Sequence, residues 1–378
     1  MDNDDDLHGS LERLVRLGRT PDVDIRPVLL RVLVDMFVRR LHHTPDDLTQ
    51  FGEMIGRLLD ESDLEVRRTV AEKLAGHPAT PRRLLDRFLG EGGAVAAPVL
   101  SLAAVDASAL VRAAVWGAPT MAVAVAGRPD LTAEIVEGLI NRPEPEVLLA
   151  VAENAAAPIE ADAFRYLVRR ARGDADLGRA LLRRDGRAAD CAPLFLLANS
   201  EQRAAVILAA RREDLSPDAP RQRVRLTSDE AAALARVERA VLSPDREGFD
   251  TALAVALNLR LEDAWRLIDD PKGEPLALAL AAIGASAELA ARVFILSGPA
   301  IGHSVMAVRR LTALVDGMPR RTAARLVAVM TQGTPLASRR PAPEAEPQSR
   351  GEDGRSVARA HERAEGLAAA AQRRIKGA

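Results

Sequence analysis

Few residues of this chain combine the types and spacing that catalysis or metal binding requires. The six histidines are scattered, and only His42 and His43 are adjacent. Neighbouring residues on a helix point in different directions, which argues against a shared metal site. Cys191 is the single cysteine, so neither an intramolecular disulfide nor a multi-thiolate zinc site can form within the chain. Because no histidine or other base is next to it on its expected helix, we interpret Cys191 as a buried structural thiol.

Motifs for nucleotide binding and hydrolysis are also missing. The sequence has no G-x-x-x-x-G-K, no G-x-G-x-x-G after a strand, no H-E-x-x-H and no G-x-S-x-G. The run from Gly90 to Gly93 lies between two expected helices and lacks a lysine, so it predicts a turn. Asp269 and Asp270 are adjacent in another expected turn, where we interpret them as solvated, because acid–base pairs need contrasting environments. The sequence therefore predicts no catalytic residue, no cofactor and no metal ligand.

A repeated five-residue pattern supplies the one candidate binding surface. It reads LAGHP from Leu74, LAAVD from Leu102, VAGRP from Val125, VAENA from Val151 and LLRRD from Leu181. Its fourth positions are His77, Val105, Arg128, Asn154 and Arg184. Equivalent positions of stacked repeats line up along one edge, so His77, Arg128, Asn154 and Arg184 form a candidate interaction ridge. Unconstrained variation among turn residues is the alternative explanation.

The elements that must position this ridge are pairs of short helices. The pattern recurs at intervals of about 23 to 30 residues, a period that indicates a stacked helical array. Ser62 and Glu65 predict a capping box, and Val66, Val70 and Leu74 follow at helical spacing. Further helices are expected after Thr80-Pro81, Thr132 and Asp190, among other starts. One helix pair cannot bury its apolar stripe alone, whereas stacked pairs bury it for one another.

Helices before the repeats are expected to cover the open end of the array. Helical spacing runs from Leu7 to Leu17, and Pro27 precedes the apolar segment Val28 to Leu41. Thr44 predicts the next N-cap, with Pro45 at the first helical position and acidic residues in the first turn. A terminal repeat needs such a cover for solubility.

Composition limits the classes of function. The chain has 378 residues, of which 48% are hydrophobic but only 3% aromatic, so Ala, Leu and Val must build the core. The net charge of −2, with acids interleaved among the arginines, argues against nucleic-acid binding. The acidic N-terminus does not resemble a signal peptide, and no run of 18 apolar residues occurs. We therefore expect a cytoplasmic protein without membrane insertion.

Several stretches resemble a family of uncharacterised bacterial HEAT-like proteins, a domain of unknown function. They are EVRRTVAEKLAGHPATP from Glu65, VAAPVL from Val95, VAGRPDLT from Val125, EVLLAVAENAAAP from Glu146 and LIDDPKGEPLALALAAIG from Leu267. The resemblance extends over about residues 30–330. It implies a helical array without an established reaction, and it transfers no functional residues.

We therefore predict an all-α, HEAT-like helical-repeat solenoid with an N-terminal helical cap and a second C-terminal helical region. The expected segments are a cap (1–61), HEAT-like repeats (62–214), a C-terminal helical region (223–333), a disordered linker (334–354) and a C-terminal helix or tail (355–378). The leading hypothesis is a non-catalytic scaffold or regulatory adaptor that binds a partner protein along a helical surface. The alternatives are an enzyme or small-ligand receptor with a pocket between the two helical regions, and a nucleic-acid-binding array.

Overall fold

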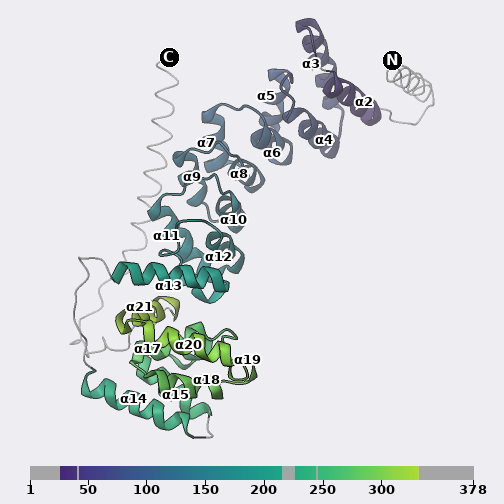
Figure 1. The fold of residues 1–378 in the computed structure, drawn as a ribbon. Helices are drawn as coiled ribbons and strands as arrows, with labels where there is room; N and C mark the ends of the chain where they lie inside the picture. Colours follow the sequence, from purple (N-terminus) through teal and green to yellow (C-terminus); the bar gives the residue numbers. More distant parts are fainter. Residues whose placement is uncertain (1–25, 41, 215–225, 244–245, 332–378) are drawn as a thin grey trace, which may run out of the picture. The chain divides into compact units, whose positions relative to one another are not determined.

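The described part of the chain is helical throughout. The computed structural model describes residues 26–40, 42–214, 226–243 and 246–331 (Figure 1). Within these ranges every regular element is an α-helix or a short 3-10 helix, which confirms the predicted all-α class. The expected helix Leu7 to Leu17, the linker 334–354 and the tail 355–378 lie outside the described residues. The chain divides into two compact units, Met1–Leu167 and Val168–Ala378, which we describe separately.

Unit 1 consists of short helices joined by tight turns. They are α2 (Arg26–Arg39), α3 (Pro45–Asp60), α4 (Leu64–Ala75), α5 (Arg82–Glu91), α6 (Gly93–Leu102), α7 (Ala107–Trp116), α8 (Pro119–Ala126), α9 (Ala133–Ile140), α10 (Pro145–Glu153) and the start of α11 (Ala161–Arg170). Alternate helices pack side by side: α4 contacts α6, α6 contacts α8, and α8 contacts α10 (Figure 1). On the other side, α7 contacts α9. Unit 1 therefore has a two-layer core in which each helix is covered by its neighbours.

Local caps explain where several of these helices begin. The Thr44 hydroxyl accepts a hydrogen bond from the Asp47 N–H, and the Asp47 carboxylate accepts one from the Thr44 N–H, which forms a capping box at α3. The Thr132 hydroxyl accepts from the Ile135 N–H at the start of α9. The N-caps predicted at Thr44 and Thr132 are thereby confirmed.

The start of α4 differs from the prediction by one residue. Asp63, not Ser62, is the N-cap, and its carboxylate accepts a hydrogen bond of 2.8 Å from the Val66 N–H. The Ser62 hydroxyl instead donates to the Leu58 carbonyl of the preceding helix, at 2.6 Å. The predicted capping box at Ser62 is wrong because its hydroxyl already satisfies the end of α3.

The turn predicted between Gly90 and Gly93 is narrower than expected. Helix α5 continues to Glu91, and α6 begins directly at Gly93. Gly92 separates them with a φ of 71°, a conformation that side chains with a Cβ disfavour. Gly93 has a φ of 53° as well, so two successive glycines make the connection between α5 and α6.

The five-residue pattern marks the C-terminal ends of five helices, α4, α6, α8, α10 and α12. Its first residue is fully buried in four of the five copies: Leu74, Val125, Val151 and Leu181, each at 0% exposure. In the second copy Leu102 is 58% exposed, whereas Leu100 is 1% exposed. The ungapped pattern was therefore out of register at α6, where Leu100 supplies the core contact.

Unit 2 is organised around one fully buried helix. Its elements include η1 (Ala171–Gly173), α12 (Ala175–Leu182), η2 (Ala192–Leu197), α13 (Ser200–Asp214), α14 (Ser228–Val241), α15 (Arg246–Leu257), α16 (Leu261–Ile268), α17 (Glu274–Ile283), α18 (Ala287–Leu296), α19 (Pro299–Gly302), α20 (Val305–Gly317) and α21 (Arg320–Thr331). Every residue of α17 is buried, and α15, α16, α20 and α21 all pack against it (Figure 1). Despite this apolar centre, no helix within the described ranges has the length and hydropathy needed to cross a bilayer.

Cys191 lies in the core of unit 2, as predicted. Only 3% of the residue is exposed, and burial, with a smaller contribution from Asp190, raises the pKa of the Cys191 thiol to about 12. The expected α-helix starting at Asp190 is instead the 3-10 helix η2, with Cys191 at its N-cap. At this pKa the neutral thiol dominates at pH 7, which suits a packing role.

The register of α4 and α6 predicts unequal effects at Leu74 and Leu102. Leu74→Ala should destabilise the protein by roughly 2–5 kcal/mol, because it leaves a cavity in a close-packed core. Leu102→Ala removes the same atoms from an exposed position and should cost less than about 1 kcal/mol. Urea unfolding followed by circular dichroism measures both values, and equal losses would contradict this register.

Candidate functional site

The Arg128 side chain, predicted to lie on an open ridge, is buried against the C-terminal end of helix α6. One guanidinium nitrogen, Nη1, donates to the carbonyls of Leu100 and Ala103 at 2.8 and 3.0 Å. The other two nitrogens donate to the Asp130 carboxylate at 2.7 and 2.8 Å. These hydrogen bonds hold the pKa of Asp130 below its usual range. Arg128 therefore satisfies the C-terminal end of α6 and fixes the turn that follows α8.

Asn154 occupies the corresponding place one helix pair later. Its Nδ2 donates to the carbonyls of Ala126 and Arg128 at 2.7 and 2.6 Å, at the end of α8. The last carbonyls of a helix have no partner within it, so donors from outside must satisfy them where water is excluded. Arg128 and Asn154 thus play one structural role at the ends of α6 and α8.

Arg142 has the same role in the other row of helices, and the sequence reasoning missed it. Its Nη1 donates to the carbonyls of Ala114 and Val115, both at 3.2 Å, and its remaining nitrogens bind the Glu144 carboxylate. The signal was available: the tripeptide Arg-Pro-acid occurs at Arg128 and again at Arg142. The proline lies two residues beyond the C-cap, where it prevents the helix from continuing, and the acidic residue two positions after the arginine pairs with the guanidinium.

His77 lies among aromatic rings rather than beside a helix end. Its ring centroid is 5.2 Å from that of Phe37 and 5.8 Å from that of His43. Burial, with a smaller contribution from His43, lowers the pKa of His77. In the described residues, His77 Nδ1 and His43 Nε2 are buried without a hydrogen-bond partner. The neutral imidazole is therefore the form that suits this environment.

Arg184, the fourth predicted ridge residue, belongs to unit 2. It is half-buried, and burial together with Arg187 lowers the pKa of its guanidinium. The ridge residues thus have different environments: helix-end hydrogen bonds for Arg128 and Asn154, aromatic packing for His77, and partial burial for Arg184. A binding role for these residues stays a prediction.

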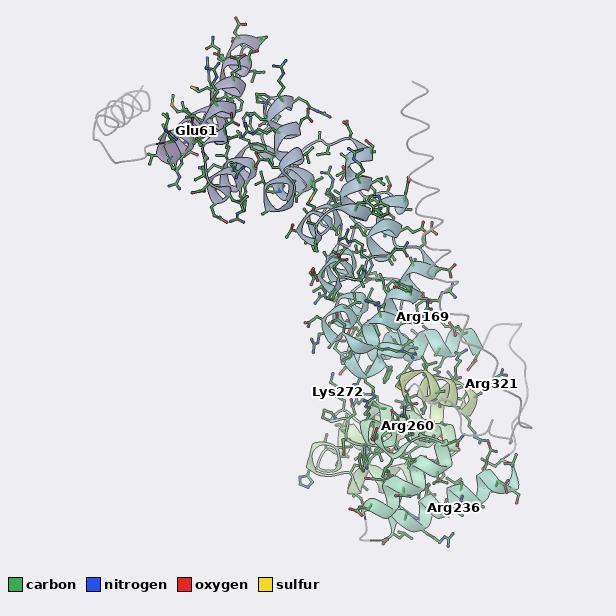
Figure 2. The ribbon with its side chains drawn as sticks, turned by 180° about the vertical axis from the view of Figure 1, so that it is seen from behind. Glu61, Arg169, Arg236, Arg260, Lys272 and Arg321 are labelled. Carbon is green, nitrogen blue, oxygen red and sulfur yellow. The ribbon has the colours of Figure 1, made fainter. Side chains whose placement is uncertain are left out.

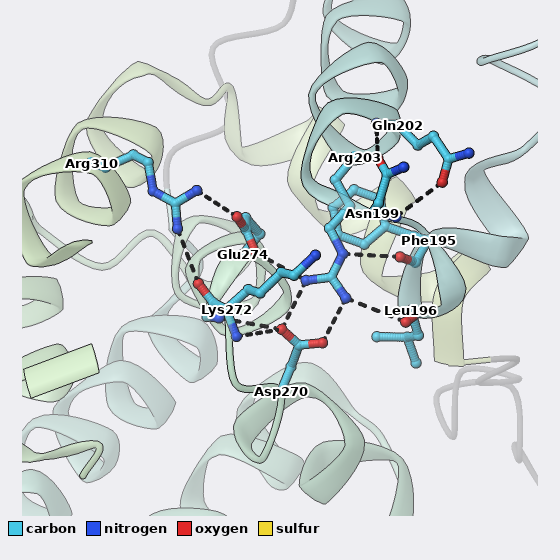
Figure 3. A network of polar contacts seen from close by, with 10 residues as sticks. Phe195, Leu196, Asn199, Gln202, Arg203, Asp270, Lys272, Glu274 and Arg310 are labelled. Carbon is cyan, nitrogen blue, oxygen red and sulfur yellow. Dashed lines mark hydrogen bonds and ion pairs between the residues drawn. The ribbon is translucent and has the colours of Figure 1, made fainter. Parts of the chain in front are cut away.

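A buried arginine holds together three helices of unit 2 (Figure 3). The Arg203 side chain of α13 is 3% exposed, and its five N–H groups have partners. It donates to the carbonyls of Phe195 and Leu196, to both carboxylate oxygens of Asp270 at 2.6 and 2.8 Å, and to Glu274 at 2.9 Å. Arg310 of α20 donates to the other oxygen of Glu274 at 2.7 Å. Two positive and two negative groups therefore form a neutral network around the N-terminus of α17.

Asp270 belongs to this network, so its interpretation as a solvated turn residue is wrong. Its side chain is only 10% exposed, and it also accepts hydrogen bonds from the backbone N–H groups of Lys272 and Gly273. Burial alone would raise the pKa of Asp270, but the hydrogen bonds and charge of Arg203 outweigh it and lower that pKa. The neighbouring Asp269 is exposed, as expected. The sequence did not indicate the role of Asp270, because its partner Arg203 is 67 residues away in the chain.

Four exposed aliphatic residues lie at the end of α18 and at the start of α20, which are joined through the short helix α19 (Figure 1). Ile295, Leu296, Val305 and Met306 are 59%, 65%, 67% and 73% exposed. The backbone of Gly302 packs directly on the carbonyl end of α18, since a Cβ placed there would lie 2.3 Å from the Ile295 oxygen. This contact brings the start of α20 against the end of α18. We call these four residues the apolar corner.

Positive charges of unit 2 are distributed over several elements. Figure 2 labels Arg236 on α14, Arg260 before α16, Lys272 before α17 and Arg321 on α21. Phosphate binding requires a continuous run of such groups, and ion pairs interrupt it, for example Arg320 with Glu230 at 2.5 Å. The apolar corner is therefore the more distinctive feature of this surface.

The helices and their contacts define an all-α protein, with short helices that pack in succession in unit 1 and a buried central helix in unit 2. Residues 95–233, from α6 into α14, match the model of a family described as an uncharacterised protein conserved in bacteria (DUF2336). This match confirms the predicted resemblance to a bacterial domain of unknown function. A search of the curated proteins finds no match, and a search of the solved structures finds none either.

Removing the guanidinium of Arg128 should destabilise unit 1. Arg128→Ala leaves the carbonyls of Leu100 and Ala103 without their donor, and we expect a loss of about 2–4 kcal/mol in urea unfolding. Arg112→Ala is the matched control, because Arg112 is exposed on α7, and it should change stability by less than about 0.5 kcal/mol. Similar small effects of both variants would show that the helix-end contacts contribute little.

Asp270→Asn should change how stability depends on pH. Because folding lowers the pKa of Asp270, its carboxylate contributes stability above the unfolded-state pKa of about 3.9, and this contribution disappears as the pH falls through the folded-state value. At pH 7 the variant should be less stable by roughly 2–3 kcal/mol. This difference should shrink below about pH 4.

Urea unfolding at several pH values tests this expectation. Asp269→Asn serves as the control, because Asp269 is exposed beside Asp270. A difference between the wild type and Asp270→Asn that stays constant from pH 7 to pH 3 would disprove the assigned role.

Proposed function

We propose that this protein is a cytoplasmic adaptor that binds a partner protein through the apolar corner of unit 2. We further propose that its stacked helical pairs are repeats of a HEAT-like type, an architecture that commonly presents long binding surfaces. Binding, rather than catalysis, is the activity proposed for the described residues.

The apolar corner is the observation that supports this proposal. Ile295, Leu296, Val305 and Met306 are all more than half exposed, although they lie within 12 residues of one another in sequence. Single exposed apolar residues are common on protein surfaces, whereas large exposed apolar patches mark interaction sites. The packing of α18 against α20 brings the four residues to neighbouring helix ends. Leaving such a group in water forgoes the hydrophobic free energy that a partner would supply on binding.

The corner also has a rigid support, which favours specific binding. Phe294 at 0% and Val293 at 3% exposure anchor the end of α18 in the core. The Ser304 hydroxyl caps α20 by accepting from the Ala307 N–H. A preformed surface loses little conformational entropy on association, so more of the contact energy appears as affinity.

Affinity capture with a paired variant tests the proposed function. The tagged full-length protein is incubated with a lysate of the native host cell, and captured proteins are identified by mass spectrometry. We expect Val305→Ser with Met306→Ser to lose a partner that the wild type retains, by at least about tenfold, since central apolar contacts dominate binding energy.

The control is Val255→Ser, which removes another exposed apolar side chain, at 57% exposure on α15. It should capture the same partner as the wild type does. Circular dichroism verifies that each variant is folded. Equal capture by the wild type and the double variant would overturn the proposed function.

A further inference from the structure

We infer that the partner segment which covers the apolar corner is an acidic amphipathic helix. This inference rests on the proposed function and adds the chemistry of the partner. It follows from the charges that surround the corner and from the shape of the surface.

The rim of the apolar corner is basic. Within about one helical turn of the corner, the charged residues of α18 and α20 are Arg292, Arg309 and Arg310, whereas the acidic Glu288 and Asp316 lie further along the two helices. Arg292 precedes Ile295 by one helical turn, and Arg309 follows Met306 by one turn, so each lies on the same side of its helix as the corner. Both arginines are exposed.

These two arginines differ from the arginines of the buried network in unit 2. In the described part of the chain, neither Arg292 nor Arg309 forms an ion pair. Arg310, by contrast, binds Glu274, and Arg203 binds both Asp270 and Glu274. The rim therefore keeps two positive charges available beside an apolar surface, and a partner with carboxylates next to its own apolar stripe would complement both.

An amphipathic helix fits this combination of groups. Its apolar residues, three or four positions apart, form a stripe that can cover the aliphatic side chains of α18 and α20. Glutamates on the two sides of that stripe would reach Arg292 and Arg309. Guanidinium groups favour carboxylates in particular, because they can form paired hydrogen bonds with them.

The C-terminal segment of this same chain is a poor match for the rim. Residues 356–375 have apolar residues at helical spacing, namely Val357, Ala360, Ala364, Leu367 and Ala371. The same segment contains four arginines and only two glutamates, so its net charge is positive. Positive charge on both surfaces would oppose docking. A separate acidic partner is therefore favoured over this segment.

A lipid surface is also disfavoured as the occupant. Proteins that lie on membranes commonly place Trp and Tyr at the level of the lipid headgroups. The corner contains only aliphatic residues, and Phe294, which is adjacent to Ile295 in the sequence, is fully buried. The side chains at the corner are thus better suited to a protein groove contact.

Two labelled peptides test the inference by fluorescence anisotropy with the full-length protein. One is a designed amphipathic peptide of about 18 residues, five helical turns, with a leucine stripe flanked by glutamates. Its twin carries lysine at every glutamate position. At about 150 mM salt we expect the glutamate peptide to bind at least about tenfold more tightly than the lysine peptide.

Variants of the protein then assign the preference to the corner and its rim. Arg292→Glu with Arg309→Glu should remove the preference for the glutamate peptide, whereas lysine at both positions should retain most of it. Val305→Ser with Met306→Ser should weaken binding of both peptides. Arg112→Glu, on α7, should have no effect.

Four outcomes would overturn the inference. They are equal affinity for the two peptides, a preference that survives Arg292→Glu with Arg309→Glu, binding to vesicles of phosphatidylcholine and phosphatidylserine in place of the peptide, and self-association that requires Val305 and Met306. If capture from lysate depends on the corner while the peptides bind equally, the proposed function stands and the acidic partner is wrong. If Val305→Ser with Met306→Ser captures the same partner as the wild type does, the proposed function itself is wrong.

Discussion

The carbonyl groups at the ends of short helices impose the main constraint on unit 1. Each helix leaves its last carbonyls without an internal partner, and stacking places several of them away from water. Helices such as α8 and α9 are only 8 residues long, so these ends form a large share of the backbone. Arg128, Arg142 and Asn154 supply the missing donors from the following pair of helices. The same hydrogen bonds that satisfy one helix therefore fix the position of the next.

Arginine suits this role better than lysine would. Its planar group offers five donors, so Arg128 and Arg142 bind a nearby carboxylate and distant carbonyls at once. Arg203 uses the same chemistry in unit 2, where it joins η2, α13 and α17. The carboxylates neutralise the buried charges, whose desolvation would otherwise be costly. Part of the arginine content of this chain thus has a structural explanation.

Local features of the fold were predictable from the sequence, and long-range ones were not. The caps at Thr44 and Thr132 were found because cap and partner are three residues apart. The second copy of the repeated pattern was misaligned at Leu102, because a five-residue match does not fix the register of a helix. The Arg203 network escaped notice because nothing near Arg203 in the sequence identifies Asp270 as its partner. Exposure at Val305 and Met306 likewise depends on tertiary packing, since their spacing alone suits a buried helix face.

The apolar corner combines two kinds of group that are often satisfied at other places in the molecule. Buried arginines such as Arg128 and Arg142 bind carbonyls within the fold, and Val125 and Val151 near the ends of α8 and α10 are fully covered, although a single aliphatic residue such as Leu102 is exposed. At the corner both kinds of group remain exposed together. Either one alone would be ordinary on a protein surface. Their combination on the supported ends of α18 and α20 leaves apolar surface and positive charge unsatisfied at one place, and a single acidic, amphipathic partner would satisfy both.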